Sequence, residues 1–151
     1  MQLNPAKTEV IWFGSRSSHR KTECIDLSLY AGDDVIKPVS VVRDLGVLLD
    51  EELMMKQHIN VVANIAFYHI RRLKNMRYIL GPKITANLVS AFVRNTDWNR
   101  PVFAGLPATT IAPLQQVQNA AARFVKGLSP RDHTSALRDL HWLPIQHVIS
   151  Y

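Results

Sequence analysis

Four basic side chains fall within seven residues near the middle of the chain: Arg71, Arg72, Lys74 and Arg77. On a helix, Arg71, Lys74 and Arg77 would lie near one another, because residues three apart are neighbours. Tyr68 adds an aromatic ring nearby, and Arg72 lies about 100° further round the helix. Such a face can clamp the phosphates of a nucleic-acid backbone. A solvated helix face with no partner is the alternative interpretation of the same pattern.

Paired carboxylates occur at Asp33 and Asp34, three and four residues after Tyr30. Two aspartates can hold Mg²⁺ ions that activate a hydroxyl nucleophile and stabilise a leaving phosphate. Such a site needs a further carboxylate far upstream, and only 32 residues precede Asp33. Gly32 followed by two aspartates is also typical of a turn. We therefore predict a turn here, with no metal site and no catalytic residue.

Six histidines and one cysteine are the other potential metal ligands. His133, His141 and His147 are eight and six residues apart, which matches no ligand face of a helix. Cys24 and His19 have no second pair, so we predict no zinc site. A single cysteine cannot form an internal disulfide, which suits a reducing cytoplasmic or nuclear compartment.

The charge is divided unevenly along the 151 residues. Residues 1–50 carry six Lys/Arg against seven Asp/Glu, whereas residues 51–151 carry 12 against five. Between Leu53 and Leu128 there are ten bases and a single acid, Asp97. This stretch is suited to a polyanion such as RNA or DNA, although a basic surface that only aids solubility has the same composition.

Composition and hydropathy exclude two other classes of protein. A hydrophobic fraction of 47% excludes wholesale disorder. No apolar run approaches the ~18–20 residues that span a bilayer, so we expect no membrane partner. The first residues lack the apolar core of a signal peptide, and we expect an intracellular chain.

The N-terminal third has the pattern of strands and turns. Short apolar or alternating runs predict strands at residues 9–13, 25–29, 35–36 and 44–50. Residues 15–22 are predicted to form a polar loop. Gly46 falls inside the last run, where a glycine often marks a bulge or a close backbone approach.

From residue 51 onward the apolar period becomes helical. A first helix carries apolar residues from Ile59 to Met76 and ends at Gly81-Pro82, and a second spans residues 84–93. A third runs through residues 111–128, capped by Thr109 or Thr110, with Gly127 near its end. Its polar side chains are expected to face away from the core: Gln115, Gln116, Gln118, Asn119, Arg123 and Lys126. A short helix is expected at 135–140. The fold class is therefore α+β, a short β region followed by a basic helical region.

Six phrases in order carry a resemblance to a known family. They are LNPAKTE (3–9), RDLGVLLD (43–50), FYHIRRL (67–73), AGLP (104–107), LQQVQNAAAR (114–123) and LHWLP (140–144). Together they resemble the last part of the reverse transcriptase of LINE-type, non-LTR retrotransposons, of the jockey-like and chicken-repeat-like group. The resemblance covers nearly the whole chain.

The resemblance implies a role for each region. Residues 1–50 would be the end of the palm and the primer grip, with Lys7 in the late palm motif and Leu45 and Gly46 beneath the primer 3′ end. Residues 51–128 would be the thumb, and 129–151 the start of a truncated connector. The implied contacts to a template–primer duplex of RNA and DNA are Arg71, Arg72, Lys74, Arg77, Arg123 and Lys126.

The same resemblance predicts that this chain is a fragment of a larger fold. The family's catalytic aspartates precede the LNPAKT phrase, so the Mg²⁺ of the parent RNA-directed DNA polymerase would be held outside it. We expect no polymerase activity and no cofactor here, with the remainder of the polymerase missing. Around 95–101 and 133–137 the sequence is one residue shorter than the family pattern, which fits either a relic copy or divergence in an active lineage. A non-enzymatic helical protein-interaction module or a non-functional relic remains the alternative.

Overall fold

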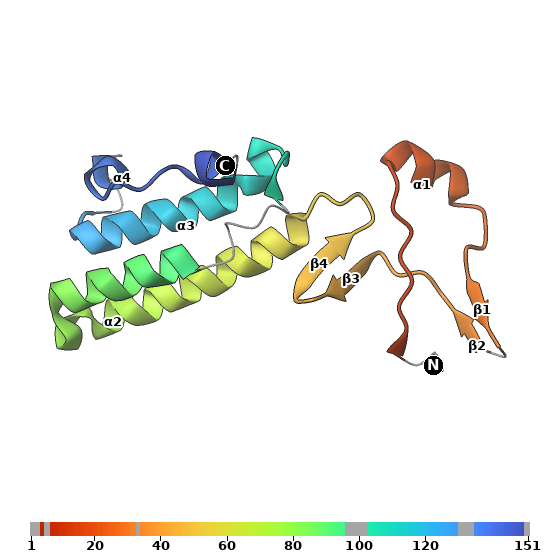
Figure 1. Ribbon diagram of the computed structural model, residues 1–151, viewed down its shortest axis with the longest axis horizontal. Helices are drawn as coiled ribbons and strands as arrows, with labels where there is room; N and C mark the ends of the chain where they lie inside the picture. The colour runs from red at the N-terminus through yellow and green to blue at the C-terminus, as the bar shows by residue number, and fades with distance from the viewer. Residues whose placement is uncertain (1–3, 5–6, 33, 96–102, 130–134, 150–151) are drawn as a thin grey trace. The chain divides into compact units, whose positions relative to one another are not determined.

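The computed structural model describes the chain except residues 1–3, 5–6, 33, 96–102, 130–134 and 150–151, and of residues 93–95 and 135 it describes the backbone alone. The chain divides into two compact units, Met1–His58 and Ile59–Tyr151, here called the strand unit and the helical unit. Strand hairpins come first and helices follow (Figure 1). The predicted α+β class is confirmed.

Two separate antiparallel hairpins form the strand unit. Strands β1 (Leu29–Ala31) and β2 (Asp34–Ile36) pair with each other, as do β3 (Val41–Asp44) and β4 (Val47–Asp50). The predicted return strand at 35–36 is present, whereas the strand predicted at 25–29 begins only at Leu29. The strand predicted at 9–13 is not formed: in the described part of this run there is one isolated bridge, between Val10 and Pro38.

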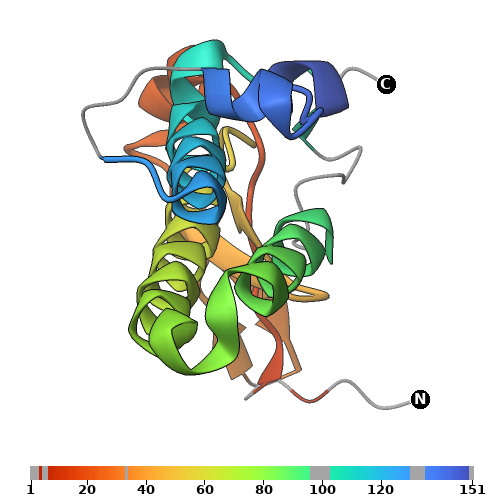
Figure 2. The ribbon, with the colours of Figure 1, turned by 90° about the vertical axis from the view of Figure 1, so that its left-hand side faces the viewer.

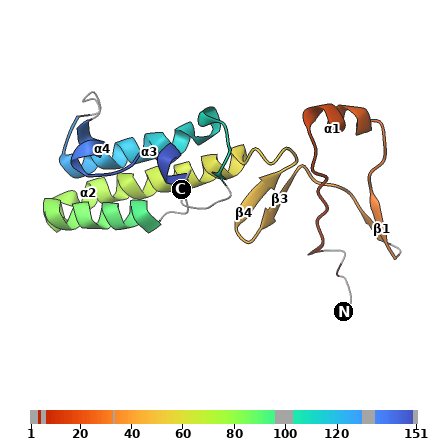
Figure 3. The ribbon, with the colours of Figure 1, turned by 45° about the horizontal axis from the view of Figure 1, so that its top comes forward.

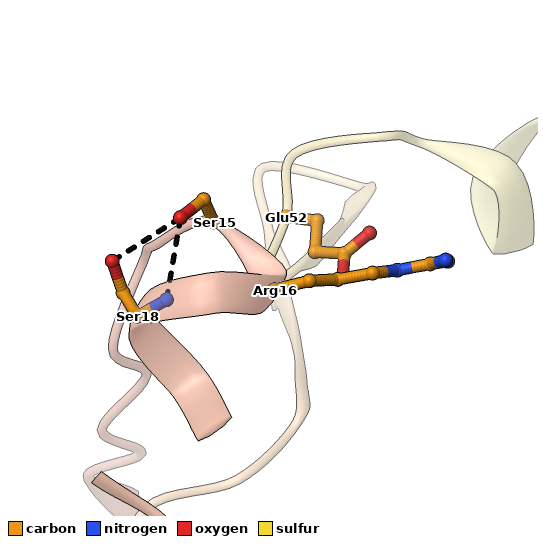
Figure 4. Close-up of polar contacts among 4 residues, drawn as sticks. All are labelled: Ser15, Arg16, Ser18 and Glu52. Carbon is orange, nitrogen blue, oxygen red and sulfur yellow. Dashed lines mark hydrogen bonds and ion pairs between the residues drawn. The ribbon is translucent and has the colours of Figure 1, made fainter. Parts of the chain in front are cut away.

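The predicted loop at 15–22 is wrong, because helix α1 (Arg16–Thr22) occupies it. Ser15 caps this helix, its Oγ accepting a hydrogen bond from the Ser18 backbone N–H at 3.3 Å. Arg16 Nε donates to Glu52 Oε1 at 2.8 Å (Figure 4). Ser15, which was predicted to begin a loop, is instead the N-cap of this helix. A serine at this position favours a helix because its hydroxyl satisfies a backbone N–H that would otherwise be unpaired.

The run 44–50 is also not one continuous strand. Leu45 and Gly46 form the two-residue turn between β3 and β4, with φ values of 45° and 89°. Positive φ at both positions is typical of a type I′ hairpin turn, whose twist matches the flanking strands. Gly46 therefore marks a turn rather than a bulge.

Polar contacts attach β4 to the first turn of the long helix α2 (Lys56–Asn95) and to the residue before it. Asp50 Oδ1 accepts a hydrogen bond from the Met55 N–H at 3.2 Å. Buried His58 accepts one from the Leu48 N–H, through its Nδ1 at 3.4 Å. Because Nδ1 acts as an acceptor, this contact requires an imidazole that is unprotonated at that nitrogen.

Helix α2 folds back on itself at Gly81, which has φ 74° and ψ 164° and precedes Pro82. Figure 2 shows the two segments side by side. The rings of His69 and Phe92 meet between them, with centroids 5.2 Å apart. Buried Thr85 donates its hydroxyl to the Gly81 carbonyl at 2.8 Å. The predicted break at Gly81-Pro82 is confirmed, and a glycine is needed there because its conformation is almost closed to other residues.

Helix α3 (Ala108–Lys126) carries the predicted apolar stripe, with Leu114, Val117 and Ala121 fully buried. Pro107 precedes it without a side-chain cap, so the predicted threonine cap is wrong; Thr110 is buried inside the first turn instead. Gly127 ends the helix in the left-handed conformation, as expected. The Leu128 N–H bonds to the Arg123 carbonyl at 2.9 Å, which is the Schellman arrangement.

Two short helices, α4 (Ser135–Asp139) and α5 (Ile145–Ile149), lie along α3 (Figure 3). Gln118 donates to the Leu143 carbonyl at 2.8 Å, and Gln115 accepts from the Ile145 N–H at 2.9 Å. Both glutamines were expected to face away from the core, which is wrong: Gln118 is buried and Gln115 half-buried. The two side-chain amides thus supply hydrogen-bond partners to backbone groups at Leu143 and Ile145, where the chain enters α5.

Candidate nucleic-acid interface

Helix α2 contains seven Lys/Arg and no acidic residue in its 40 residues. The fold places Arg71, Arg72 and Lys74 on its surface, and all three are exposed. Within the described part of the chain, none of the three forms an ion pair. Their positive charges are therefore available to an anionic partner, because no carboxylate on the same helix offsets them.

Arg72 is partly fixed by an aromatic neighbour one turn earlier. Its Nη1 donates to the Tyr68 hydroxyl at 3.4 Å, and its guanidinium carbon lies 5.7 Å from the centre of the Tyr68 ring. A guanidinium has five N–H donors, so this contact leaves others to reach phosphate oxygens.

Arg77 has a different environment from the other three. It is half-buried, and its Nη1 donates to the Phe124 carbonyl at 3.1 Å. Its guanidinium carbon lies 5.5 Å from the centre of the Phe124 ring. The last carbonyls of a helix carry partial negative charge, so Arg77 stabilises the C-terminal end of α3.

A groove of about 870 Å³ runs between the 70–82 segment of α2 and the end of α3. Its cations are Lys74, Arg77 and Arg123, and no carboxylate occurs among the residues that line it. The remaining lining residues are mostly apolar or small: Ile70, Tyr78, Gly81, Pro82, Ala120, Phe124, Gly127 and Leu128. The groove thus combines an apolar lining with positive charge.

Of the six predicted thumb contacts, the fold brings three together in the groove: Lys74, Arg77 and Arg123. Arg71 and Arg72 lie outside it, on the exposed surface of α2. Lys126 forms an ion pair with Asp139 of α4, with Nζ 3.3 Å from Oδ2, so its charge is partly neutralised.

The predicted palm and primer-grip residues belong to the strand unit. Leu45 is 91% exposed at the tip of the β3–β4 turn, next to Gly46. Lys7 is exposed, and its backbone N–H donates to the Asn4 carbonyl at 3.1 Å. None of these three residues is among those that line the groove of the helical unit.

The candidate metal ligands are spread through the chain. Asp33 and His133 lie outside the described residues, and Asp34 is exposed in β2. Among the residues that the structure describes, no group of three or more His, Cys, Asp or Glu side chains could hold a metal ion. The same residues include no helix long and apolar enough to cross a membrane.

Tyr78 lines the groove but was not among the residues that the sequence analysis singled out. It is 97% exposed and follows Lys74 by four residues, so both lie on one side of α2. The i+4 spacing was the available signal, but it did not reveal that α3 faces this side.

No known protein family, curated protein or solved structure matches the chain.

Proposed function

We propose that the helical unit binds the phosphate backbone of a nucleic-acid duplex, in the way the thumb of a LINE-type reverse transcriptase would hold its template–primer. The observation that supports this most is the exposure of Arg71, Arg72 and Lys74 on a 40-residue helix with no acidic residue. Binding of this kind is independent of sequence, because phosphate contacts position a duplex without reading its bases.

The family origin suggested by the six sequence phrases is part of the same proposal. In it, the chain is the C-terminal part of the polymerase, and the aspartates that bind Mg²⁺ belong to the preceding palm. The chain by itself then has no polymerase activity, and its contribution to the parent enzyme is to hold the RNA–DNA hybrid.

Fluorescence anisotropy on a labelled RNA–DNA hybrid tests the proposal as a function of salt. The variant replaces Arg71, Arg72 and Lys74 with Ala and keeps Arg77, because Arg77 holds the end of α3. Each lost phosphate contact removes about 0.9 from the slope of log affinity against log salt, so the slope should fall by about two to three.

A matched control removes the same charge from the strand unit, by replacing the exposed Arg20, Lys21 and Arg43 with Ala. The proposal expects this control to bind with the parent slope. Equal losses in both variants would mean that only net charge matters. An unchanged slope in the α2 variant would make this face a solvated surface.

A protein-interaction role is the second candidate, and exposed apolar side chains on α2 favour it. Ile65 is 52% exposed and Ile79 80% exposed, and Val61 and Met76 are each 44% exposed. Apolar contacts survive salt that abolishes phosphate binding. A partner that stays bound at high salt and is lost on Ile79→Ser would support this role over the first.

A further inference from the structure

The groove differs in chemistry from the exposed basic surface of α2. Lys74 and Arg123 bring positive charge to it, whereas Ile70, Phe124 and Leu128 give it an apolar lining. Tyr78 lines it as well and is 97% exposed, so no residue that the structure describes covers its ring. A surface made only for duplex phosphates would gain nothing from an exposed aromatic ring and apolar walls.

The bases of a duplex are stacked and paired, so they offer no free face to such a groove. An unpaired base has an apolar π-face on each side and a phosphate attached through its sugar. Single-strand binding sites combine a positively charged groove with aromatic side chains on which bases stack. The volume of about 870 Å³ falls in the range of sites that enclose small organic ligands.

We infer that this groove takes unpaired nucleotides of a single-stranded RNA or DNA, with a base stacked on Tyr78 and phosphates held by Lys74 and Arg123. The inference rests on the proposed function and adds a second substrate class to it. A strand leaving a duplex would then keep its contact with the protein after base pairing ends.

Arg77 acts here as a positioning residue. Its hydrogen bond to the Phe124 carbonyl ties α2 to the end of α3 and so fixes the two walls of the groove. Gly127 leaves room for it, since a Cβ at Gly127 would come within 3.0 Å of Arg77 Nη2. The guanidinium is therefore held by α3, which leaves Lys74 and Arg123 as the phosphate ligands.

Anisotropy with the full chain tests the inference on two probes, a labelled single-stranded oligouridine and a fully paired RNA–DNA hybrid. Tyr78→Ala should weaken oligouridine binding roughly ten- to a hundredfold, the effect of losing one base–aromatic stack. Tyr78→Phe keeps the ring and should bind as the parent does. Tyr30→Ala, at a 76% exposed tyrosine of the strand unit, is the matched control and should change nothing.

The hybrid separates this inference from the proposed function. Hybrid affinity should be the same in Tyr78→Ala as in the parent. A parent that binds the hybrid but not oligouridine, or a Tyr78→Ala variant that binds oligouridine unchanged, overturns the inference and leaves the proposed function standing. Equal losses on both probes also overturn it, because the ring would then serve general binding. If neither probe binds at low salt, the proposed function falls and the inference falls with it.

Discussion

The strand unit and the helical unit differ in how much apolar surface they bury. Among the described residues, three buried apolar side chains belong to the strand unit: Ile36, Val47 and Met55. Fourteen belong to the helical unit, including Phe103, Leu114 and Val117. The strand unit instead exposes Trp12, Phe13, Tyr30, Val35 and Leu45. The described helices therefore share a buried apolar core, whereas the described strands leave much of their apolar surface exposed.

The physical reason lies in where each element finds its hydrogen bonds. A helix satisfies its backbone within itself and needs a neighbour only for its apolar face. Each sheet of the strand unit has two strands, so both strands are edges, and an isolated hairpin is marginal in water. We therefore expect the strand unit to be the less stable of the two units.

Hydrogen exchange tests the comparison directly and should show the largest effect. Amides in residues 59–79 and 111–126 should approach the protection set by global unfolding of the helical unit, while those in 29–50 open at little cost. Stronger protection in 29–50 than in the two helical stretches would reverse the comparison.

Leu114→Ala should destabilise the helical unit by about 2–5 kcal/mol, because it opens a cavity at a side chain with no exposed surface. The helical signal at 222 nm should then be lost at lower temperature. Leu88→Ala, at a 43% exposed position of α2, is the control and should change stability by about 0.5 kcal/mol or less. A small effect at Leu114 would show that the helical unit has no better core than the strand unit.

Gln118→Ala should cost about 1–3 kcal/mol, because it removes both the hydrogen bond to the Leu143 carbonyl and the packing of a buried side chain. The urea midpoint of the helical unit measures this loss. Gln116→Ala, at an exposed position of the same helix, should leave the midpoint unchanged. Equal effects of the two variants would mean that the 140–149 segment is not held by this contact.

Arg77→Ala should destabilise the helical unit by about 1–2 kcal/mol through loss of its contact with the end of α3. Arg71→Ala, which removes the same charge from an exposed site, should have no measurable effect on the unfolding temperature. If the two variants unfold alike, Arg77 belongs with the surface cations instead.

Leu45→Asn should stabilise the β3–β4 hairpin by about 0.5–1 kcal/mol, the smallest effect and the only gain. Asparagine accepts the positive φ that strains leucine, and a 91% exposed side chain gives up no packing. Slower exchange in residues 41–50 would show it. A loss of protection would mean that the leucine serves the hairpin through packing.

Local signals predicted the helical half of the fold better than the strand half. The break at Gly81-Pro82 and the end of α3 at Gly127 follow from glycine and proline chemistry that acts within a few residues. The strand predictions were less accurate, because a short apolar run does not specify its pairing partner or where it turns. Leu45-Gly46 shows this, since the same run fits one strand or a hairpin.

The sequence by itself determined the positions of the long helices, the break in α2 and the concentration of positive charge on it. Only the tertiary structure decided which cations gather in the groove, because Lys74 of α2 and Arg123 of α3 are far apart in sequence. The tertiary structure also separates Arg77 from the exposed cations of α2, because Arg77 donates to the Phe124 carbonyl at the end of α3. Gln118 is buried for a similar reason, since it donates to the Leu143 carbonyl between α4 and α5. Periodicity sets the face on which a residue lies, but the neighbour that covers that face is set by long-range contacts.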